Sequence, residues 1–131
     1  MTIRLEGITV LADDVQALAE FYERALDFRV EVRDELYVAF TGHGIRVAIY
    51  SRPHMGDSTE GHESFTTPRR GQSFEFNFQC ESVGEVDRRY AEALENGAVA
   101  IGAPAAREWK QHTGFFADPE GNIHSLFADL D

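Results

Sequence analysis

The order of the elements expected from the sequence constrains its fold most, because the same order occurs twice. Extended segments with short turns surround two stretches that have helical periodicity. The first half reads as a strand, a helix and three strands, over residues 3–11, 15–26, 28–32, 37–40 and 45–50. The second half repeats this order over residues 74–80, 82–97, 99–101, 113–117 and 122–127. The sequence therefore predicts an α+β fold of two βαβββ modules.

Both helices carry recognisable ends. The first has an apolar stripe formed by Val15, Leu18, Ala19, Tyr22, Ala25 and Leu26. Asp13 or Asp14 suits its N-cap position. The second opens with Ser82 and Glu85 at capping-box spacing, and Gly97 suits a left-handed residue after its end.

The chain length favours one domain over 1–131, since each half alone is too small to be stable. The modules are expected over 1–50 and 73–131, joined by a loop over 51–72 that contains prolines and glycines. Long loops in compact domains are often lids or binding loops. Arg69 and Arg70 in this loop are expected to be a solvated pair, with closure over an anionic ligand as the alternative.

Charge and composition exclude several partners. The sequence has 23 acidic and 12 basic residues, a formal net charge of −11, which repels a phosphate backbone. We therefore expect no nucleic-acid partner, and no membrane partner because no apolar run approaches about 18 residues. The N-terminus lacks the pattern of a signal peptide, and the single cysteine, Cys80, fits a reducing cytoplasm. The acidity would steer a cationic ligand toward the protein, or it only aids solubility.

Two motifs resemble those of the vicinal oxygen chelate superfamily, which includes glyoxalase I, extradiol dioxygenases and bleomycin resistance proteins. The first is Asp14-Val15 followed by Phe21-Tyr22 and Leu26, with Asp27 where the family motif has glycine. The second runs from Trp109 to Phe116-Ala117-Asp118-Pro119-Glu120-Gly121-Asn122, with Lys110 and Gly114 as departures. The resemblance implies an open curved mixed sheet around a cleft, and a homodimer. It leaves the chemistry open, because one fold hosts many functions.

The resemblance also implies where a divalent metal would bind. The four matching positions are Gly7, Ile49, Glu75 and Ser125, and only Glu75 is a competent ligand. Shifting the match gives Leu5 or Glu6 and Ala48 or Tyr50, which does not restore a ligand set. We therefore expect no metal and no other cofactor.

The segment from Phe74 to Cys80 is the best candidate for a binding strand. Phe74, Phe76, Phe78 and Cys80 alternate with Glu75, Asn77 and Gln79. The apolar row should pack under the helices and the polar row should face the cleft, unless that row only faces solvent. The residues predicted to line the ligand site, with none assigned as catalytic, are Glu75, Asn77, Trp109, His112, Phe116 and Ser125. For Trp109 and Phe116 the alternative is a place in the core, and for His112 a place on the surface.

These patterns predict a metal-independent protein that binds a small organic ligand, by resemblance to the bleomycin resistance branch and with antibiotic sequestration as one form. The ligand is expected to be partly aromatic and to carry positive charge. One alternative is a glyoxalase-like lyase or dioxygenase with a divergent metal site, in which Glu75 and His112 would be ligands. Another is an interaction module without a ligand.

Overall fold

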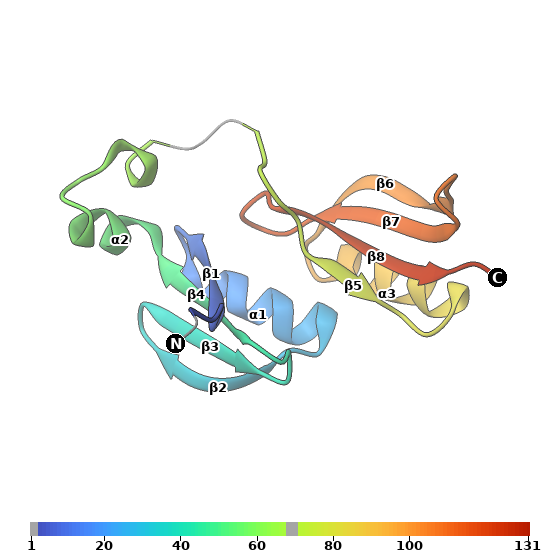
Figure 1. Ribbon diagram of the computed structural model, residues 1–131, viewed down its shortest axis with the longest axis horizontal. Coiled ribbons are helices and arrows are strands. Elements are labelled where there is room, and N and C mark those ends of the chain that lie inside the picture. Colours follow the sequence, from blue (N-terminus) through green and yellow to red (C-terminus); the bar gives the residue numbers. More distant parts are fainter. Residues whose placement is uncertain (1–2, 68–70) are drawn as a thin grey trace. The chain divides into compact units, whose positions relative to one another are not determined.

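The structure is a computed structural model that describes residues 3–67 and 71–131. Arg69 and Arg70 therefore lie outside the described residues. The chain divides into two compact units, Met1–Arg70 and Gly71–Asp131 (Figure 1). Each unit holds a four-stranded mixed sheet and the long helix that follows its first strand. The predicted α+β fold of two βαβββ modules is confirmed.

The first unit is built from β1 (Gly7–Ala12), α1 (Val15–Leu26), β2 (Arg29–Asp34), β3 (Tyr37–Thr41) and β4 (Arg46–Ser51). Its strand order is β1-β4-β3-β2, with β1 parallel to β4 and the other pairs antiparallel. Asp14 caps α1 by accepting a hydrogen bond from the Ala17 amide, as predicted. Asp27 ends the helix in the left-handed conformation, at φ 56°, which explains why this motif position commonly holds glycine.

The core of the first unit lies between α1 and one face of its sheet. The Tyr22 ring of α1 contacts Phe28 at 5.0 Å and Phe40 of β3 at 6.4 Å between centroids. Val38 shares this face with Phe40 and pairs with Ile49 of β4, which is 1% exposed. Ile49 therefore points into the core beneath α1.

The segment after β4 contains helical turns that the sequence did not predict. Residues Arg52–Ser58 form α2, and Glu63–Phe65 form a 3₁₀ turn, η1. Ser51 caps α2 through its hydroxyl oxygen, which accepts from the His54 amide, and Pro53 lies in the first turn. Pro53 is favourable there because the amide it lacks has no partner inside a helix. The segment expected as a loop therefore contains regular helical turns over these residues.

The second unit is built from β5 (Asn77–Gln79), α3 (Val83–Glu95), β6 (Val99–Ala106), β7 (Gln111–Ala117) and β8 (Ile123–Asp129). Its strand order is β5-β8-β7-β6, with β5 parallel to β8. The Ser82 hydroxyl oxygen accepts from the Glu85 amide at 3.1 Å, as the capping box predicts. The Glu85 carboxylate accepts from the amide of Glu81, one residue before the cap.

The first strand of the second unit is shorter than predicted. Phe74 is 63% exposed, so the expectation that it is buried was wrong. Sheet pairing reaches back only to Phe76, whose carbonyl accepts from the Ser125 amide and whose amide donates to His124 Nδ1. The ring of Phe76 stacks on His124 at 4.8 Å, and Phe78 contacts Phe116, so these two rings lie on the predicted side.

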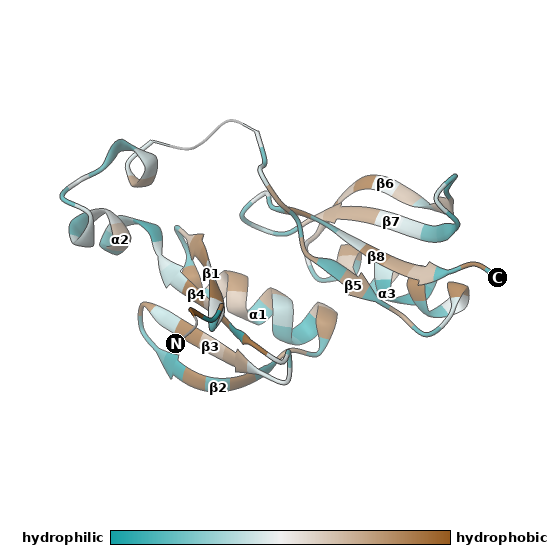
Figure 2. Ribbon diagram, in the orientation of Figure 1, coloured by the Kyte–Doolittle hydropathy of each residue, from teal (hydrophilic) through white to brown (hydrophobic). Residues whose placement is uncertain are grey.

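The edge strand β6 is longer than predicted and apolar along most of its length (Figure 2). Its pairing with β7 is interrupted twice, between Ala100 and Gly102 and between Gly102 and Ala105. Pro104 is tolerated there because an edge strand leaves some amides without a ladder partner. In the described parts of the chain, no helix is long and apolar enough to cross a membrane.

Candidate functional site

The sheet of the second unit has two unlike faces. A Cβ placed on Gly114 of β7 would lie 3.0 Å from Cδ2 of Tyr90 in α3, so this position faces the helix. Alternation puts His112 and Phe116 on the same side. The opposite face, which α3 does not cover, carries Phe115 of β7. We call it the distal face.

Four residues in register cross the distal face from β6 to β5. Gly102 pairs with Phe115, Phe115 with Ser125, and Ser125 with Asn77. The Ser125 hydroxyl donates to Oδ1 of Asn77 at 2.9 Å. At about 4.8 Å per strand this row spans about 14 Å, which suits a small organic molecule.

A second row of residues lies next to the first along the strands, and polar residues that we call the rim lie at its end. It consists of Ala105, Thr113, Phe127 and Gln79. At the rim, Gln79 and Gln111 donate to the two carboxylate oxygens of Asp129 at 3.4 and 3.1 Å. The distal face therefore combines aromatic surface at Phe127 with amide and hydroxyl groups beside it.

A cation lies on the same face. The Arg107 guanidinium is 5.5 Å from the centroid of Phe115, so it covers that ring. Its Nε and Nη2 donate to the Thr113 carbonyl, and Nη2 also donates to the Ala103 carbonyl. The Arg107 side chain is thus held in one place by two strands.

Four of the six predicted site residues lie at or near the distal face. Asn77 and Ser125 are bonded to each other there, and the exposed Glu75 precedes Asn77 by two positions, which puts it on the same side of the extended backbone. Trp109 is in the turn between β6 and β7 and is 53% exposed, so it is not a core residue. Its indole N–H donates to Gln111 at the rim.

The structure does not bring the other two predicted residues to this face. His112 lies on the α3 side, where its Nε2 is 2.8 Å from the Asp87 carboxylate. Phe116 is 0% exposed and packs against Phe78 and His124. Contact between these residues and a ligand stays a prediction, and a ligand on the distal face would not touch Phe116.

Several residues of the distal face were not in the predicted site, notably Arg107, Phe115 and Phe127, whereas Gln79 belongs to the polar row that was expected to face the cleft. A usable signal was present, because alternation from Ser125 places Phe127 and Asp129 on the same side. No local pattern points to Arg107, which reaches this face from the turn after β6.

The positions that the family uses for a metal do not fit one here. A Cβ on Gly7 would lie 2.6 Å from the Arg46 carbonyl oxygen, so no ligating side chain has room. Ile49 points beneath α1, and the Ser125 hydroxyl is directed at Asn77. Within residues 3–67 and 71–131, no group of three or more His, Cys, Asp or Glu is arranged to hold a metal ion.

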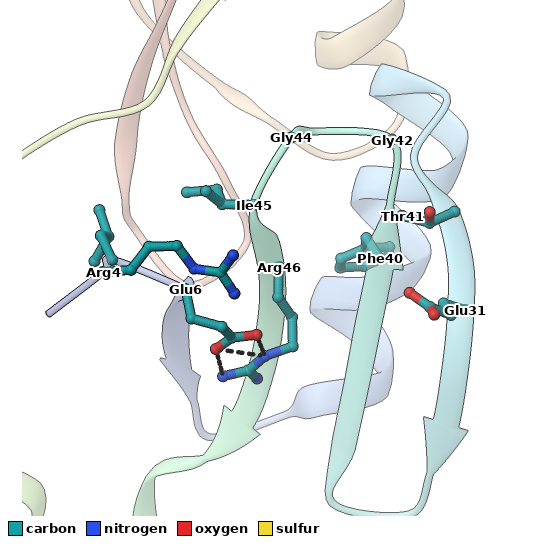
Figure 3. Close-up of a pocket in the computed structure, with 10 residues that line it drawn as sticks. Arg4, Glu6, Glu31, Phe40, Thr41, Gly42, Gly44, Ile45 and Arg46 are labelled. Carbon is teal, nitrogen blue, oxygen red and sulfur yellow. Dashed lines mark hydrogen bonds and ion pairs between the residues drawn. The ribbon is translucent and has the colours of Figure 1, made fainter. Parts of the chain in front are cut away.

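The first unit has a pocket of its own, of about 490 Å³, at the start of β4 (Figure 3). Its wall includes Arg46, whose guanidinium holds Glu6 through two short contacts of 2.8 and 2.9 Å. This hydrogen-bonded pair lowers the pKa of the Glu6 carboxyl. Figure 3 shows Arg4 beside the pair. Arg46 and Glu6 thus satisfy each other, so the pocket is a weaker candidate than the distal face.

Comparison with known proteins agrees with the fold. The family model described as "Glyoxalase/Bleomycin resistance protein/Dioxygenase superfamily" matches residues 4–125. A glyoxalase/bleomycin resistance protein/dioxygenase family enzyme from Burkholderia phytofirmans PsJN superposes with a TM-score of 0.86 at 18% identity, over 95% of this chain and 98% of that one. A glyoxalase-related enzyme from Fulvimarina pelagi gives a TM-score of 0.85 at 17% identity, over 96% and 88% of the two chains.

A third solved structure, a glyoxalase/bleomycin resistance protein/dioxygenase from Nocardioides, gives a TM-score of 0.81 at 21% identity, over 100% of this chain and 86% of that one. No curated protein sequence gives a significant match. At these identities the superpositions show the fold alone, while the family model covers most of the sequence. The chain belongs to the Glyoxalase/Bleomycin resistance protein/Dioxygenase superfamily.

Proposed function

We propose that this protein binds a small, partly aromatic organic molecule on the distal face, without a metal ion. The observation that carries the proposal is the bonded pair of Asn77 and Ser125 beside the half-buried ring of Phe127. Binding sites for small molecules combine apolar surface with a few placed polar groups in this way. Sequestration of an antibiotic, with bleomycin-type drugs as first candidates, is the specific form we propose.

The pair leaves defined groups for a ligand. With the Ser125 hydroxyl directed at Oδ1, the Nδ2 hydrogens of Asn77 have no acceptor among the described residues. Asn77 is exposed and Ser125 is 3% exposed, so the hydroxyl supports the amide from beneath. A carbonyl or ether oxygen of the ligand would accept from Asn77 while its ring lies on Phe127.

Metal independence is supported by the residues at the family positions. Gly7 and Ile49 have no donor, and the Ser125 hydroxyl is already used. Glu75 alone offers one carboxylate, whereas zinc takes about four ligands and a larger divalent ion about six.

A thermal-shift screen tests this function. Bleomycin and a panel of neutral, cationic and anionic aromatics would be added to the protein in EDTA, and separately with manganese, iron, nickel or zinc. We expect at least one compound to raise the Tm equally in both conditions, and Asn77→Ala to reduce its affinity about tenfold, whereas Glu20→Gln in the other unit should not. A shift that needs a metal would favour the lyase or dioxygenase alternative, and no shift with any compound would favour an interaction module.

We further propose that the chain works in the cytoplasm as a homodimer and unfolds as one domain, without nucleic-acid or membrane partners. Sedimentation equilibrium checks the dimer, and a single cooperative unfolding transition followed by both Trp109 fluorescence and circular dichroism checks the single domain. A transition seen by Trp109 alone would show that the second unit unfolds separately.

A further inference from the structure

Arg107 on the distal face is a cation that lacks a carboxylate partner in residues 3–67 and 71–131. Several of the other arginines in this acidic sequence form ion pairs, as Arg33 does with Glu23 and Arg46 with Glu6. Arg107 instead donates hydrogen bonds to the backbone carbonyls of Thr113 and Ala103. Its charge is therefore not neutralised within the second unit.

Some N–H donors of the Arg107 guanidinium are not used in hydrogen bonds to the described residues. An arginine side chain has five N–H groups. Nε and Nη2 supply those that bind the two carbonyls, so both N–H groups of Nη1 have no acceptor in the described residues. Because one flat side of the group covers Phe115, a ligand can reach the other side and the Nη1 edge.

The residues around Arg107 fix the position of its side chain. A Cβ on Gly102 would lie 3.3 Å from Cδ2 of Phe115, so the glycine leaves space for the ring that Arg107 covers, and 3.7 Å from Nη2 of Arg107, which is ordinary contact. A guanidinium that is already fixed loses little further freedom when it binds an oxyanion. The geometry is therefore suited to binding an oxyanion.

Thr113 gives a second indication at the same place. This residue is 3% exposed, and its buried hydroxyl has no hydrogen-bond partner in the described residues. Thr113 shares the distal face with Phe115, and its carbonyl is the group that Arg107 holds. A ligand oxygen beside Arg107 would give this hydroxyl the acceptor it lacks.

We propose that the ligand of the distal face carries a carboxylate, bound by Nη1 of Arg107, next to an aromatic part that lies on Phe127. This inference rests on the proposed binding of a small molecule and deepens it by naming the charge of the ligand, so it favours anionic aromatics over the cationic bleomycin-type drugs in the screen. It differs from the cation expected from the net charge of −11. Long-range attraction is screened over about 8 Å at physiological salt, whereas contact with a fixed guanidinium is screened much less.

Three probes of one shape test the charge directly: 2-naphthoate, 2-naphthamide and 2-(aminomethyl)naphthalene. Each would be titrated into the labelled protein by NMR, with the Trp109 indole resonance as a local reporter, since Trp109 is two residues from Arg107. We expect naphthoate to bind about tenfold more tightly than naphthamide, about 1.4 kcal/mol. Its affinity should fall as salt is raised, while that of naphthamide should not.

Variants locate the effect. Arg107→Met should remove the preference for naphthoate and change naphthamide affinity less than about threefold, because a neutral amide does not depend on the guanidinium charge. Arg107→Lys should keep part of the preference, and Thr113→Val should weaken naphthoate about three- to tenfold. Arg24→Met, which removes an exposed arginine in the other unit, is the matched control. The salt dependence of the unmodified protein keeps the test valid if Arg107→Met fails to fold.

The outcomes separate the two proposals. Equal affinities, or tighter binding of the ammonium compound, would overturn the carboxylate assignment while small-molecule binding stands. If Arg107→Met binds naphthoate as tightly as the unmodified protein, Arg107 is only a clamp between β6 and β7. If none of the three probes binds at millimolar concentration, the carboxylate assignment fails, and the broader screen decides the proposed function.

Discussion

The Ser125 hydroxyl on β8 and the Asn77 amide oxygen on β5 are 2.9 Å apart, and they join the edge strand to the middle of the sheet on the distal face. Replacing Asn77 by alanine leaves the buried Ser125 hydroxyl without an acceptor. Replacing Ser125 by alanine leaves the exposed Asn77 amide, which water can satisfy. We therefore expect Asn77→Ala to lower the free energy of unfolding by about 1–3 kcal/mol and Ser125→Ala by about 1 kcal/mol.

Urea unfolding of both variants and of the double variant measures the coupling. The double variant should be more stable than the sum of the single effects predicts, by about 1 kcal/mol, because Ser125→Ala removes the hydroxyl that Asn77→Ala leaves without an acceptor. Strict additivity would show that the hydrogen bond contributes nothing to stability.

Phe116 and Trp109 should respond oppositely to truncation. Phe116 is fully buried between α3 and the sheet, so Phe116→Ala should cost about 3–5 kcal/mol of unfolding free energy. Trp109 is half exposed in a turn, so Trp109→Ala should cost less than about 1 kcal/mol. Chemical denaturation followed by circular dichroism compares them, and a larger loss for Trp109 would contradict its placement.

Gly114 is expected to tolerate no side chain. An alanine Cβ there would lie 2.8 Å from Cγ of Pro104 and 3.0 Å from the Tyr90 ring, which is anchored by its hydroxyl bond to the Phe115 carbonyl. We expect Gly114→Ala to lower the free energy of unfolding by about 1–3 kcal/mol through overpacking. Gly84→Ala is the control, because the nearest atom is 4.0 Å away and alanine favours the helix by up to about 1 kcal/mol.

Cys80 should be a poor nucleophile. Burial, and next the charge of Glu85, raise the pKa of its thiol to about 11. At pH 8 we expect iodoacetamide to react with Cys80 at least about tenfold more slowly than with glutathione, and denaturation in urea to remove the difference. Glu85→Gln should speed the reaction, because it removes a charge that opposes the thiolate.

The same shift has a consequence for stability. Because the pKa is higher in the folded protein, the unfolded chain releases this proton first as the pH rises above about 9. The contribution of Cys80 to the free energy of unfolding should therefore be present below pH 9 and lost as the pH rises toward 11, and Cys80→Ala should lack that loss. An identical pH profile for this variant in that range would contradict the assignment.

Local interactions were predictable because they depend on residues close together in the sequence. Asp14 caps α1, and Ser82 caps α3, through bonds to amides three residues away. The Asp118 carboxylate closes its turn by accepting from the amides of Glu120 and Asn122. The periodic stripes of both long helices, and the repeated βαβββ order, follow from patterns of the same short range.

The sequence by itself determined that each strand has two kinds of face, and only the tertiary structure decided which residues meet on them. Alternation in β7 separates Phe115 from Phe116, but it does not say which of them the helix covers. Gly114 decides this, because its missing side chain lets Tyr90 of α3 pack against that side of the strand. Arg107 joins the distal face only because two strands present carbonyls to it, and such long-range contacts depend on how the whole sheet folds, beyond the reach of any local pattern.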